Sequence, residues 1–502
     1  MKVITISAKA QCVDCDTEFF NGYEWKKIKD YNVDDMVLQY NENGTANLVK
    51  PLEYIVNEDS ILYSFATPKL NMCLSADHEC YYITDKHNLT HKPFYKIMES
   101  HINAKSSGFG GRFITSFNYG GKGIDLSNDE IRLMCAVIAD SALIECENKC
   151  YLNLKKERKI NELRSILKKL NIDYKEFRFK SMPGYIRFKF TPPRMEKYFS
   201  KYWYDCNQEQ LKIICDNVYK WDGFITKNGS VAISTCNIDT ANFIQFAYSA
   251  CGYRANILTT DRRGTLRGGK DERKSIEYCV SASKNTLVQI ANRHTDRSKF
   301  FKEYATKDGL SYCFTVPSRM LVLRRNNKIF ITGNCGKDHT ANLLKNKLEQ
   351  DGSKVLITHF ADLLKYIVTN FFDWDGQKDE AGRTKLQYVG TDVIRTQRPD
   401  YWVDFIAGIL EMFPDEWDYV IIPDTRFPNE NDIFKKKGFD ITTVRVIRPD
   451  FDNGLTEEQK SHASETALDN YKFDCWLINN GDETINDEVD KLIDYINLGG
   501  NM

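Results

Sequence analysis

The chain has 502 residues, of which 42% are hydrophobic and 28% are charged, and its formal net charge is −1. This length exceeds what one hydrophobic core usually supports, and the composition excludes a fibrous or largely disordered chain. No apolar run is long enough to span a bilayer and the first residues lack the apolar core of a secretory signal, so we expect a cytoplasmic protein without membrane contact. The 15 cysteines are odd in number, which favours reduced thiols.

The first predicted element is a β-strand over residues 3–7, where Val-Ile-Thr-Ile-Ser is rich in β-branched side chains. A short turn follows it and ends at Gln11, so this segment is incomplete without a helix. Cys12 then begins a segment of different character. Cys12 and Cys15 have Cys-X-X-Cys spacing, but no second pair accompanies them, which disfavours redox or zinc chemistry.

Ser75-Ala-Asp-His78 places a hydroxyl three residues before an imidazole. Histidine can act as an acid and a base near neutral pH, whereas serine cannot. His78 is therefore a candidate proton donor, with a buried structural histidine as the alternative.

Residues 125–303 carry 32 Lys and Arg against 22 Asp and Glu. This surplus favours a polyanion partner such as DNA or RNA, although solvated helix faces explain it as well. Within the region, residues 129–140 and 210–222 are two apolar helical stretches that end in Asp140 and Asp222.

Two alternating stretches in the same region, residues 185–190 and 231–235, predict β-ribbons that read a DNA groove. Six basic residues accompany them: Arg262, Arg263, Arg267, Lys270, Arg273 and Lys274.

Residues 312–316 and 328–333 are short β-type stretches, and the second one leads into Asn334-Cys335. Beyond this point, residues 342–348 have apolar residues at helical spacing. Joined to residues 1–11, they complete a strand, a turn and a helix, the setting in which backbone amides and a helix N-terminus cradle phosphate.

Residues 335–502 resemble the viral deoxynucleoside monophosphate kinase family, which implies a P-loop kinase that uses ATP and acts in a host cytoplasm. Ala8 and Asp338 depart from the GxxxxGKS/T pattern, although Gly-Lys-Asp occurs in a branch of nucleoside monophosphate kinases. The resemblance rests on Lys385-Leu-Gln387, Gly390-Thr-Asp392-Val-Ile-Arg395, Asp424-Thr-Arg426-Phe-Pro-Asn429-Glu430 and His462-Ala-Ser464-Glu465.

The kinase reading assigns roles to charged residues of the flank. Lys337 is expected to reach the terminal phosphates of ATP. Asp424, which ends a buried strand, is expected to hold Mg²⁺ through water or to orient the nucleotide, with a turn or helix cap as the alternative. The other candidates are Gly336 and Asp338 for ATP phosphates, and Arg383, Arg395, Arg398 and Arg426 for substrate phosphates or, alternatively, surface salt bridges.

The ends of residues 12–334 resemble those of an intein, a self-excising Hint domain. The matching blocks are Cys12-Val-Asp-Cys15-Asp16-Thr17-Glu18, Gly22-Tyr-Glu-Trp25-Lys-Lys-Ile28, Ser75-Ala-Asp-His78, Tyr312-Cys313-Phe314-Thr315-Val316 and Lys328-Ile-Phe-Ile-Thr-Gly333-Asn334.

The resemblance implies that Cys12 attacks the carbonyl of Gln11, that Cys335 captures the acyl group, and that Asn334 cyclises. His78 would donate the proton, while Ser75 orients the scissile peptide. Cys313 is either a thiol acid or base or a core residue. Alternatively, Cys12 and Cys335 are buried thiols and Asn334 is a turn residue. Gly333 stands where inteins commonly have His.

The two helical stretches resemble the paired helices of LAGLIDADG homing endonucleases. Asp140 and Asp222 would then bind Mg²⁺ and cleave double-stranded DNA of the intein-free allele. Ser141 stands where the family favours Gly, and a decayed remnant is the alternative.

The sequence therefore predicts a multidomain precursor. A mostly-β Hint splicing domain (12–120 and 305–334) contains an α+β LAGLIDADG endonuclease (125–303) and is flanked by a split α/β P-loop kinase (1–11 and 335–502). Splicing would release an ATP:deoxynucleoside monophosphate kinase, for which a homodimer is left open. The rival reading is an unspliced DNA-binding protein with a decayed nuclease and a non-functional kinase scaffold.

Overall fold

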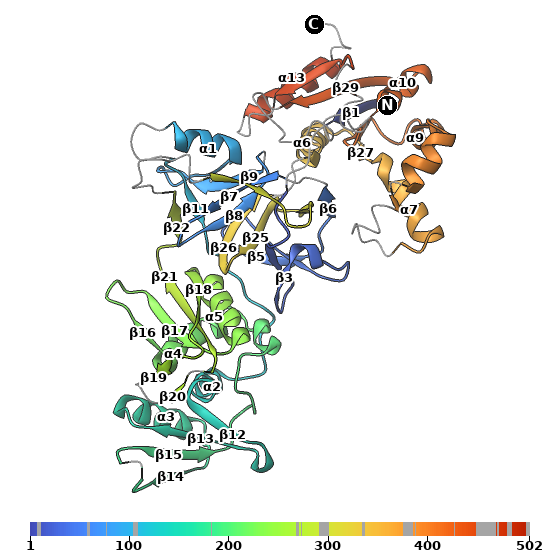
Figure 1. Cartoon of the computed structure of the whole chain (residues 1–502). Coiled ribbons are helices and arrows are strands. Elements are labelled where there is room, and N and C mark those ends of the chain that lie inside the picture. Colours follow the sequence, from blue (N-terminus) through green and yellow to red (C-terminus); the bar gives the residue numbers. More distant parts are fainter. Residues whose placement is uncertain are drawn as a thin grey trace.

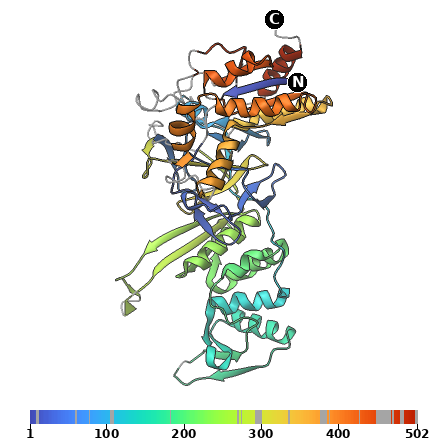
Figure 2. The same ribbon diagram turned by 90° about the vertical axis from the view of Figure 1, so that its right-hand side faces the viewer.

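The computed structural model contains three parts that lie in a row, as Figures 1 and 2 show. The part at the top of Figure 1 holds β1 (Lys2–Ser7) and α13 (Thr484–Asn497), the middle part is rich in strands, and the part at the bottom combines helices and strands. The described residues are 1–7, 12–57, 61–76, 78–103, 109–181, 183–267, 271–272, 274–290, 301–333, 337–374, 385–386, 388–425, 427–447, 468, 471–478 and 484–497. The expected multidomain mixed α/β architecture is confirmed.

The top part is a parallel sheet covered by helices. Strand β1 stands in the middle of the order β27-β28-β1-β29-β30, and every pairing is parallel. Residues 3–7 are all buried, as expected for a central strand with both faces covered. The other strands are β27 (Val355–Ile357), β28 (Tyr419–Ile422), β29 (Asp440–Ile447) and β30 (Cys475–Ile478). The helices are α6 (Lys337–Gln350), α7 (Phe360–Phe371), α9 (Tyr401–Met412), α10 (Pro428–Lys436), α13 and the π-helix η5 (Tyr388–Arg395).

Strand β1 packs against α6 although residues 12–334 separate them in sequence. Ile4 shares one apolar cluster with Leu344 of α6. Val3, on the opposite face by the two-residue period of a strand, packs in a second cluster with Trp402 of α9. The predicted strand and helix are confirmed, and the two flanks build one core.

The middle part is mostly β. Among its described residues the only α-helix is α1 (Phe94–Ile102), accompanied by the 3-10 turn η1 (Ile28–Asp30). Its core includes the rings of Phe19, Phe65, Phe94 and Phe330. Its strands are β2 (Glu18–Phe20), β3 (Trp25–Lys27), β4 (Val37–Tyr40), β5 (Ala46–Val49), β6 (Glu53–Asn57), β7 (Ile61–Ala66), β8 (Asn71–Leu74), β9 (Glu79–Ile83), β10 (Leu89–Pro93), β11 (Arg112–Ile114), β22 (Leu287–Gln289), β23 (Phe301–Ala305), β24 (Ser311–Thr315), β25 (Met320–Arg325) and β26 (Lys328–Gly333).

One strand of the middle part, β22, falls inside the range 125–303 that was expected for the endonuclease, and a second, β23, crosses its end. Strand β22 pairs with β11, and β23 pairs with β7. The backbone hydrogen bonds of these short strands are completed by the middle part, so the boundary expected at 303 does not coincide with the strand pairing. The bottom part ends instead with β21 (Ile276–Ser283).

The bottom part repeats one order of elements. A helix, two strands, a second helix and two strands occur first as α2 (Asn128–Asp140), β12 (Ser141–Ile144), β13 (Lys149–Leu154), α3 (Glu157–Lys169), β14 (Tyr174–Arg178) and β15 (Ile186–Phe190). They recur as α4 (Gln208–Asp222), β16 (Gly223–Ile225), β17 (Val231–Thr235), α5 (Ile238–Ala250), β18 (Arg254–Asp261) and β21. The sheet orders β12-β13-β15-β14 and β16-β17-β21-β18 correspond strand for strand, as the predicted αβ repeat requires. The remaining elements are the 3-10 turns η2 (Glu145–Glu147) and η3 (Lys201–Asp205) and the ribbon β19 (Leu266–Arg267) and β20 (Asp271–Glu272).

Helices α2 and α4 pack against each other at the centre of this repeat. Both begin with a capping box, Ser127 with Glu130 and Asn207 with Gln210, which satisfies amides of the first turn. Their apolar faces belong to one shared core. The matched starts and the shared core bring the two helix ends to corresponding places.

Candidate active sites

Cys12 and Ser75 are joined by two hydrogen bonds. The backbone N–H of Cys12 donates to Oγ of Ser75 (3.0 Å), and the backbone N–H of Ser75 donates to the carbonyl oxygen of Cys12 (2.9 Å). Both residues are buried. The Cys12 nitrogen belongs to the peptide bond that follows residue 11, so Ser75 is hydrogen-bonded to one end of that peptide bond.

His78 is placed beside this pair by its backbone. Its N–H donates to the carbonyl oxygen of Ser75 (3.1 Å), and its own carbonyl oxygen accepts from Phe94 (2.9 Å). The side chain of His78 is fully buried. Helix α1, which begins at Phe94, thus fixes the turn that carries the imidazole.

Cys313 lies against Cys12. These two thiols and Ile55 form a small apolar cluster, separate from the larger cores. Strand β24 brings Cys313 there, because Tyr312 exchanges two backbone hydrogen bonds with Val13 (2.8 Å each). The structure therefore brings together Cys12, Ser75, His78 and Cys313, four residues that the sequence predicted from three distant blocks.

Strand β26 ends close to the segment that carries Ser75 and His78. Gly333, the last residue of β26, lies against Glu79: a Cβ added to Gly333 would be 2.6 Å from the carbonyl oxygen of Glu79 and 3.2 Å from the ring of Tyr81. The hydroxyl of Thr332 donates to the same carbonyl oxygen (3.3 Å). A side chain at position 333 would therefore need a shift of the neighbouring backbone.

Several predicted residues lie outside the part of the chain that the structure describes. They are Ala8, Gln11, Asn334, Cys335, Gly336, Arg383 and Arg426, and the side chains of Lys337 and Asp338.

In the bottom part, α2 and α4 end at Asp140 and Asp222. Desolvation by the surrounding atoms and the nearby Asp140 carboxylate raise the pKa of Asp222 to about 6, although the residue is exposed to solvent. The two carboxylates repel each other. A divalent cation that prefers hard oxygen ligands would bind both of them and remove this repulsion. The residues present fit Mg²⁺.

Two lysines that the sequence analysis did not name lie around these carboxylates. Lys159 of α3 forms an ion pair with Asp140, and its ammonium lies 5.6 Å from the ring centroid of Trp221. Lys197 donates to three carbonyl oxygens in the last turn of α2 at 2.7–3.2 Å, and desolvation lowers its pKa. No local sequence pattern identifies these lysines, because each approaches from a different segment.

Ser141 and Gly223 follow the two helices and behave differently. Ser141 is accommodated, because its hydroxyl donates to the carbonyl oxygen of Val137 (2.6 Å). A Cβ at Gly223 would lie 2.6 Å from the carbonyl oxygen of Ala232. Of the two residues that follow the paired helices α2 and α4, only Gly223 is therefore required to be glycine.

The two predicted β-stretches are present as strands β15 and β17, and their contact with DNA stays a prediction. On β15, Arg187 stacks on the rings of Tyr151 (4.4 Å) and Phe179 (4.8 Å) and donates to Asn153 (2.8 Å). Beyond β18, Arg262 and Arg263 form ion pairs with Glu277 (3.0 Å) and Asp261 (2.6 Å). Lys274 is exposed. Lys270 and Arg273, and the side chain of Arg267, fall outside the described residues.

In the top part, Asp424 follows β28 and binds the start of α7. Its two carboxylate oxygens accept from the backbone N–H groups of Phe360 and Ala361 (3.1 Å each). This is the geometry of the helix-capping alternative. It leaves the role of Asp424 toward a nucleotide as a prediction.

Arg395 is occupied by protein partners. Its guanidinium lies 2.6 Å from Oε1 of Glu430 and 4.0 Å from the ring centroid of Phe427. Arg395 therefore forms a salt bridge with Glu430, which was the alternative to a phosphate contact, and its side chain is partly buried. Arg398 is exposed.

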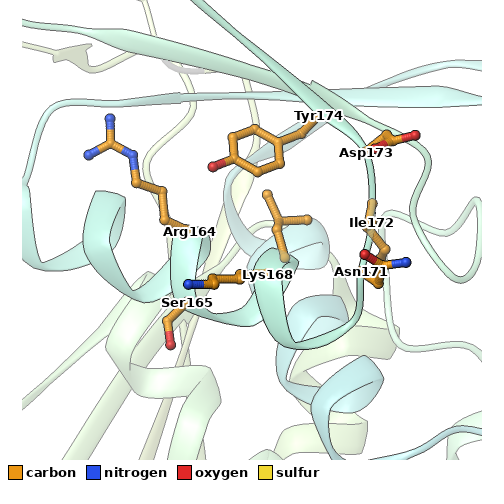
Figure 3. Close-up of a pocket in the computed structure, with 8 residues that line it drawn as sticks. Arg164, Ser165, Lys168, Asn171, Ile172, Asp173 and Tyr174 are labelled. Carbon is orange, nitrogen blue, oxygen red and sulfur yellow. The ribbon is translucent and has the colours of Figure 1, made fainter.

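A hollow of about 330 Å³ lies elsewhere, at the end of α3 (Figure 3). Arg164 and Lys168 come from the helix, and Asp173 and Tyr174 come from the turn and strand that follow it. No predicted site residue lines this hollow. Within the described ranges, no three His, Cys, Asp or Glu side chains gather as a metal site, and no helix is long and apolar enough to cross a membrane.

Comparison with known proteins identifies a family for part of the chain. Residues 374–491 match the family described as deoxynucleotide monophosphate kinase. The C-terminal flank thus carries a kinase-family domain, as the sequence predicted. The whole chain has no match among curated proteins.

Solved structures that resemble the chain include I-DmoI in complex with DNA and Mn, with 14% identity and a TM-score of 0.22 over 34% of this chain and 93% of that one. Mesophilic variants of the homing endonuclease I-DmoI have 14% identity and a TM-score of 0.22 over 34% and 92%. Full-length DUF199/WhiA from Thermatoga maritima has 13% identity and a TM-score of 0.23, and the match covers 37% of this chain and 55% of that protein.

Proposed function

We propose that the chain is a self-splicing precursor whose insert, residues 12–334, excises itself and joins the two flanks. The observation that carries the proposal is the meeting of both ends of the insert at one short segment. The Cys12 amide is bonded to Ser75, and Gly333 lies against Glu79. The flanks give independent support, because β1 and α6 build one core across the insert.

The first step uses the groups around Cys12. Its sulfur forms a bond to the carbonyl carbon of residue 11, the peptide C–N bond breaks, and the departing amine takes up a proton. Ser75 fixes the orientation of that nitrogen, and His78 supplies the proton. The proton that the Cys12 thiol loses returns to His78, so the step is balanced, and Cys313, which clusters with Cys12, would assist this transfer.

The later steps use residues at the other end. The thiolate of Cys335 attacks the new thioester and releases Cys12, which gives a branched chain. The side-chain nitrogen of Asn334 then attacks its own carbonyl carbon, closes a succinimide and frees the insert. A shift of the acyl group from sulfur to nitrogen restores a peptide bond between the flanks.

Electrophoresis tests this proposal against the rival of an unspliced DNA-binding protein. Splicing should convert the 58.2 kDa chain into products of about 37 and about 21 kDa. The double variant Cys12→Ala and Asn334→Ala should yield neither product. Full-length protein that persists without either substitution would overturn the splicing proposal.

A second activity, site-specific cleavage of double-stranded DNA by the insert, is favoured by the two helix ends. Asp140 and Asp222 would hold Mg²⁺, which when bound activates water and stabilises the departing oxygen of a phosphodiester. Lys159 holds the Asp140 carboxylate, and Lys197 fixes the last turn of α2. The test is cleavage of an insert-free gene copy, where equal cutting by Asp140→Asn and Asp222→Asn would exclude both carboxylates as metal ligands.

The joined flanks are proposed to transfer phosphate from ATP to a deoxynucleoside monophosphate. The kinase-family match supports this activity. So does the position of α6, which begins at Lys337 and would follow β1, the central strand, once the flanks are joined. A helix N-terminus beside a strand end is suited to phosphate. Because the insert interrupts this loop, kinase activity should depend on splicing.

A further inference from the structure

We propose that Cys12 and Cys313 are a redox-active pair of thiols, which a peroxide converts into a disulfide and a dithiol reduces again. The disulfide itself is inferred from the packing of the two cysteines. Its effect on splicing rests on the proposed function, in which Cys12 is the thiol that starts the first step.

The register of two strands sets the cysteines opposite each other. Val13 and Tyr312 form an antiparallel bridge and exchange two backbone hydrogen bonds of 2.8 Å. One residue further along, Cys12 is therefore opposite Cys313, at a position without hydrogen bonds between the two backbones. At such a position the Cα atoms are about 4.5 Å apart and both side chains point to the same face. The backbone of Cys12 agrees with this, because its N–H and its carbonyl oxygen are bonded to Ser75 instead.

The two side chains meet in a small buried cluster. Its third member, Ile55, is the residue opposite Cys313 on β6. Cys12 is 0% exposed and Cys313 is 2% exposed, and both carry thiols in this structure. Disulfides join Cα atoms that are about 4.4–6.8 Å apart, so this pair can bond with little movement of the strands.

Other buried cysteines of the middle part stand opposite residues of a different kind. Cys73 on β8 pairs with Ser64 on β7, and Cys80 on β9 pairs with Lys92 on β10. Neither partner can form a disulfide. Cys73 is therefore a matched control for the reactivity of a buried thiol in the same sheet region.

The oxidation balances with one molecule of hydrogen peroxide. The thiolate of one cysteine attacks a peroxide oxygen, the O–O bond breaks, and hydroxide leaves and takes up the thiol proton as water. The second sulfur then attacks the sulfenic acid, the S–S bond forms, and the S–O bond breaks to release a second water. Two thiols are oxidised while one peroxide is reduced. Hydrogen peroxide is little larger than water, which suits a buried pair.

The disulfide blocks the first step of the proposed splicing. That step needs the sulfur of Cys12 as a thiolate, and a sulfur bonded to Cys313 is not a nucleophile. A dithiol restores both thiols by exchange and so releases the block. The precursor therefore stays whole under oxidising conditions and splices after reduction.

Mass spectrometry tests the disulfide without relying on splicing. The full-length Asn334→Ala chain is treated with hydrogen peroxide, alkylated and digested without reductant. We expect two peptides joined through Cys12 and Cys313, and their separation by dithiothreitol. Adding Cys73→Ser should leave the joined peptides unchanged, whereas adding Cys313→Ser should abolish them. Absence of the joined peptides from both the Asn334→Ala chain and its Cys73→Ser variant would overturn the inference.

Splicing of the unsubstituted chain tests the consequence. Freshly translated chain is divided between hydrogen peroxide and dithiothreitol. The peroxide portion should remain whole and carry the joined peptides, and later addition of dithiothreitol should release both splicing products. Equal yields of the products in the two portions would overturn the control of splicing by this disulfide. Failure to splice in dithiothreitol would instead overturn the proposed function, while the peptide measurement still decides the disulfide.

Discussion

The amide nitrogen of Cys12 lies 3.0 Å from Oγ of Ser75, although 62 residues separate them in sequence. In the proposed splicing reaction, this hydrogen bond would restrain the nitrogen that leaves carbon when the thiol of Cys12 attacks. A hydroxyl in this place orients the peptide and cannot supply the proton, which leaves that role to His78.

Replacing Ser75 tests this relationship. Ser75→Ala removes one hydrogen-bond acceptor, worth about 1 kcal/mol, so we expect the first step to slow about 3- to 10-fold. Thiol-induced release of residues 1–11 measures the rate. Ser64→Ala on β7, the strand paired with β8, is the control. Equal rates for both variants would remove Ser75 from the mechanism.

Gly333→His, which places a histidine where inteins commonly have one, should impair the proposed splicing. Gly333→His would force a Cβ to within 2.6 Å of the Glu79 carbonyl oxygen, so β26 must shift and Asn334 cyclisation should slow. Gly408→Ala is the control, because an added Cβ there meets nothing within 4 Å. Faster release of residues 335–502 from Gly333→His would contradict the steric argument.

The Asp222 carboxyl should make the insert less stable as pH rises. Its pKa is about 6 in the folded protein and near 3.8 otherwise, so between these values the folded state binds more protons than the unfolded state. Stability therefore falls as pH rises from about 4 to about 6, and Asp222→Asn should be more stable than the parent at pH 7. Thermal unfolding of the excised insert without Mg²⁺ measures the difference.

The comparison for Asp222 needs two controls. Asp216→Asn changes an exposed acid on the same helix and should not alter the midpoint. Added Mg²⁺ should narrow the gap between the parent and Asp222→Asn, because the cation binds the ionised carboxylates. If Asp222→Asn exceeded the parent in stability by as much at pH 4 as at pH 7, the titration of Asp222 would not be the cause of the difference.

Lys337 should be required for phosphoryl transfer by the joined flanks. We expect Lys337→Ala to lower kcat about 100- to 1000-fold, the usual effect of losing one group that stabilises developing charge. Transfer from ATP to each deoxynucleoside monophosphate measures it. Lys436→Ala, an exposed lysine on α10, is the control. Full activity of the Lys337→Ala product would dismiss its role.

Ile4 should be essential to the stability of the joined flanks. The Ile4 side chain is fully buried in the apolar core that β1 shares with α6. Ile4→Ala should therefore lower the free energy of unfolding by about 2–5 kcal/mol. Urea unfolding of the spliced product measures this value. Phe371→Ala removes a ring that is 72% exposed and should change stability little. A small effect of Ile4→Ala would mean that β1 is not the central strand.

Local patterns were enough to predict several parts of this protein. The run from Val3 to Ser7, the helix around Leu344 and the matched helices that end at Asp140 and Asp222 are each encoded by neighbours in sequence. Backbone conformation and apolar periodicity are short-range properties, so they can be read without knowing what each segment packs against. The interrupted strand and helix likewise follow from residues beside the two junctions.

Only the tertiary structure decided which distant groups meet. It placed β22 and β23 with the middle part, set Lys159 beside Asp140, raised the pKa of Asp222, and laid Gly333 against Glu79. Strand pairing and side-chain proximity depend on the shapes of surfaces that form after the chain has folded back on itself. A linear pattern holds no record of them, and this is why the sequence predicted Asp140 and Asp222 but not Lys159 and Lys197, which lie around these carboxylates.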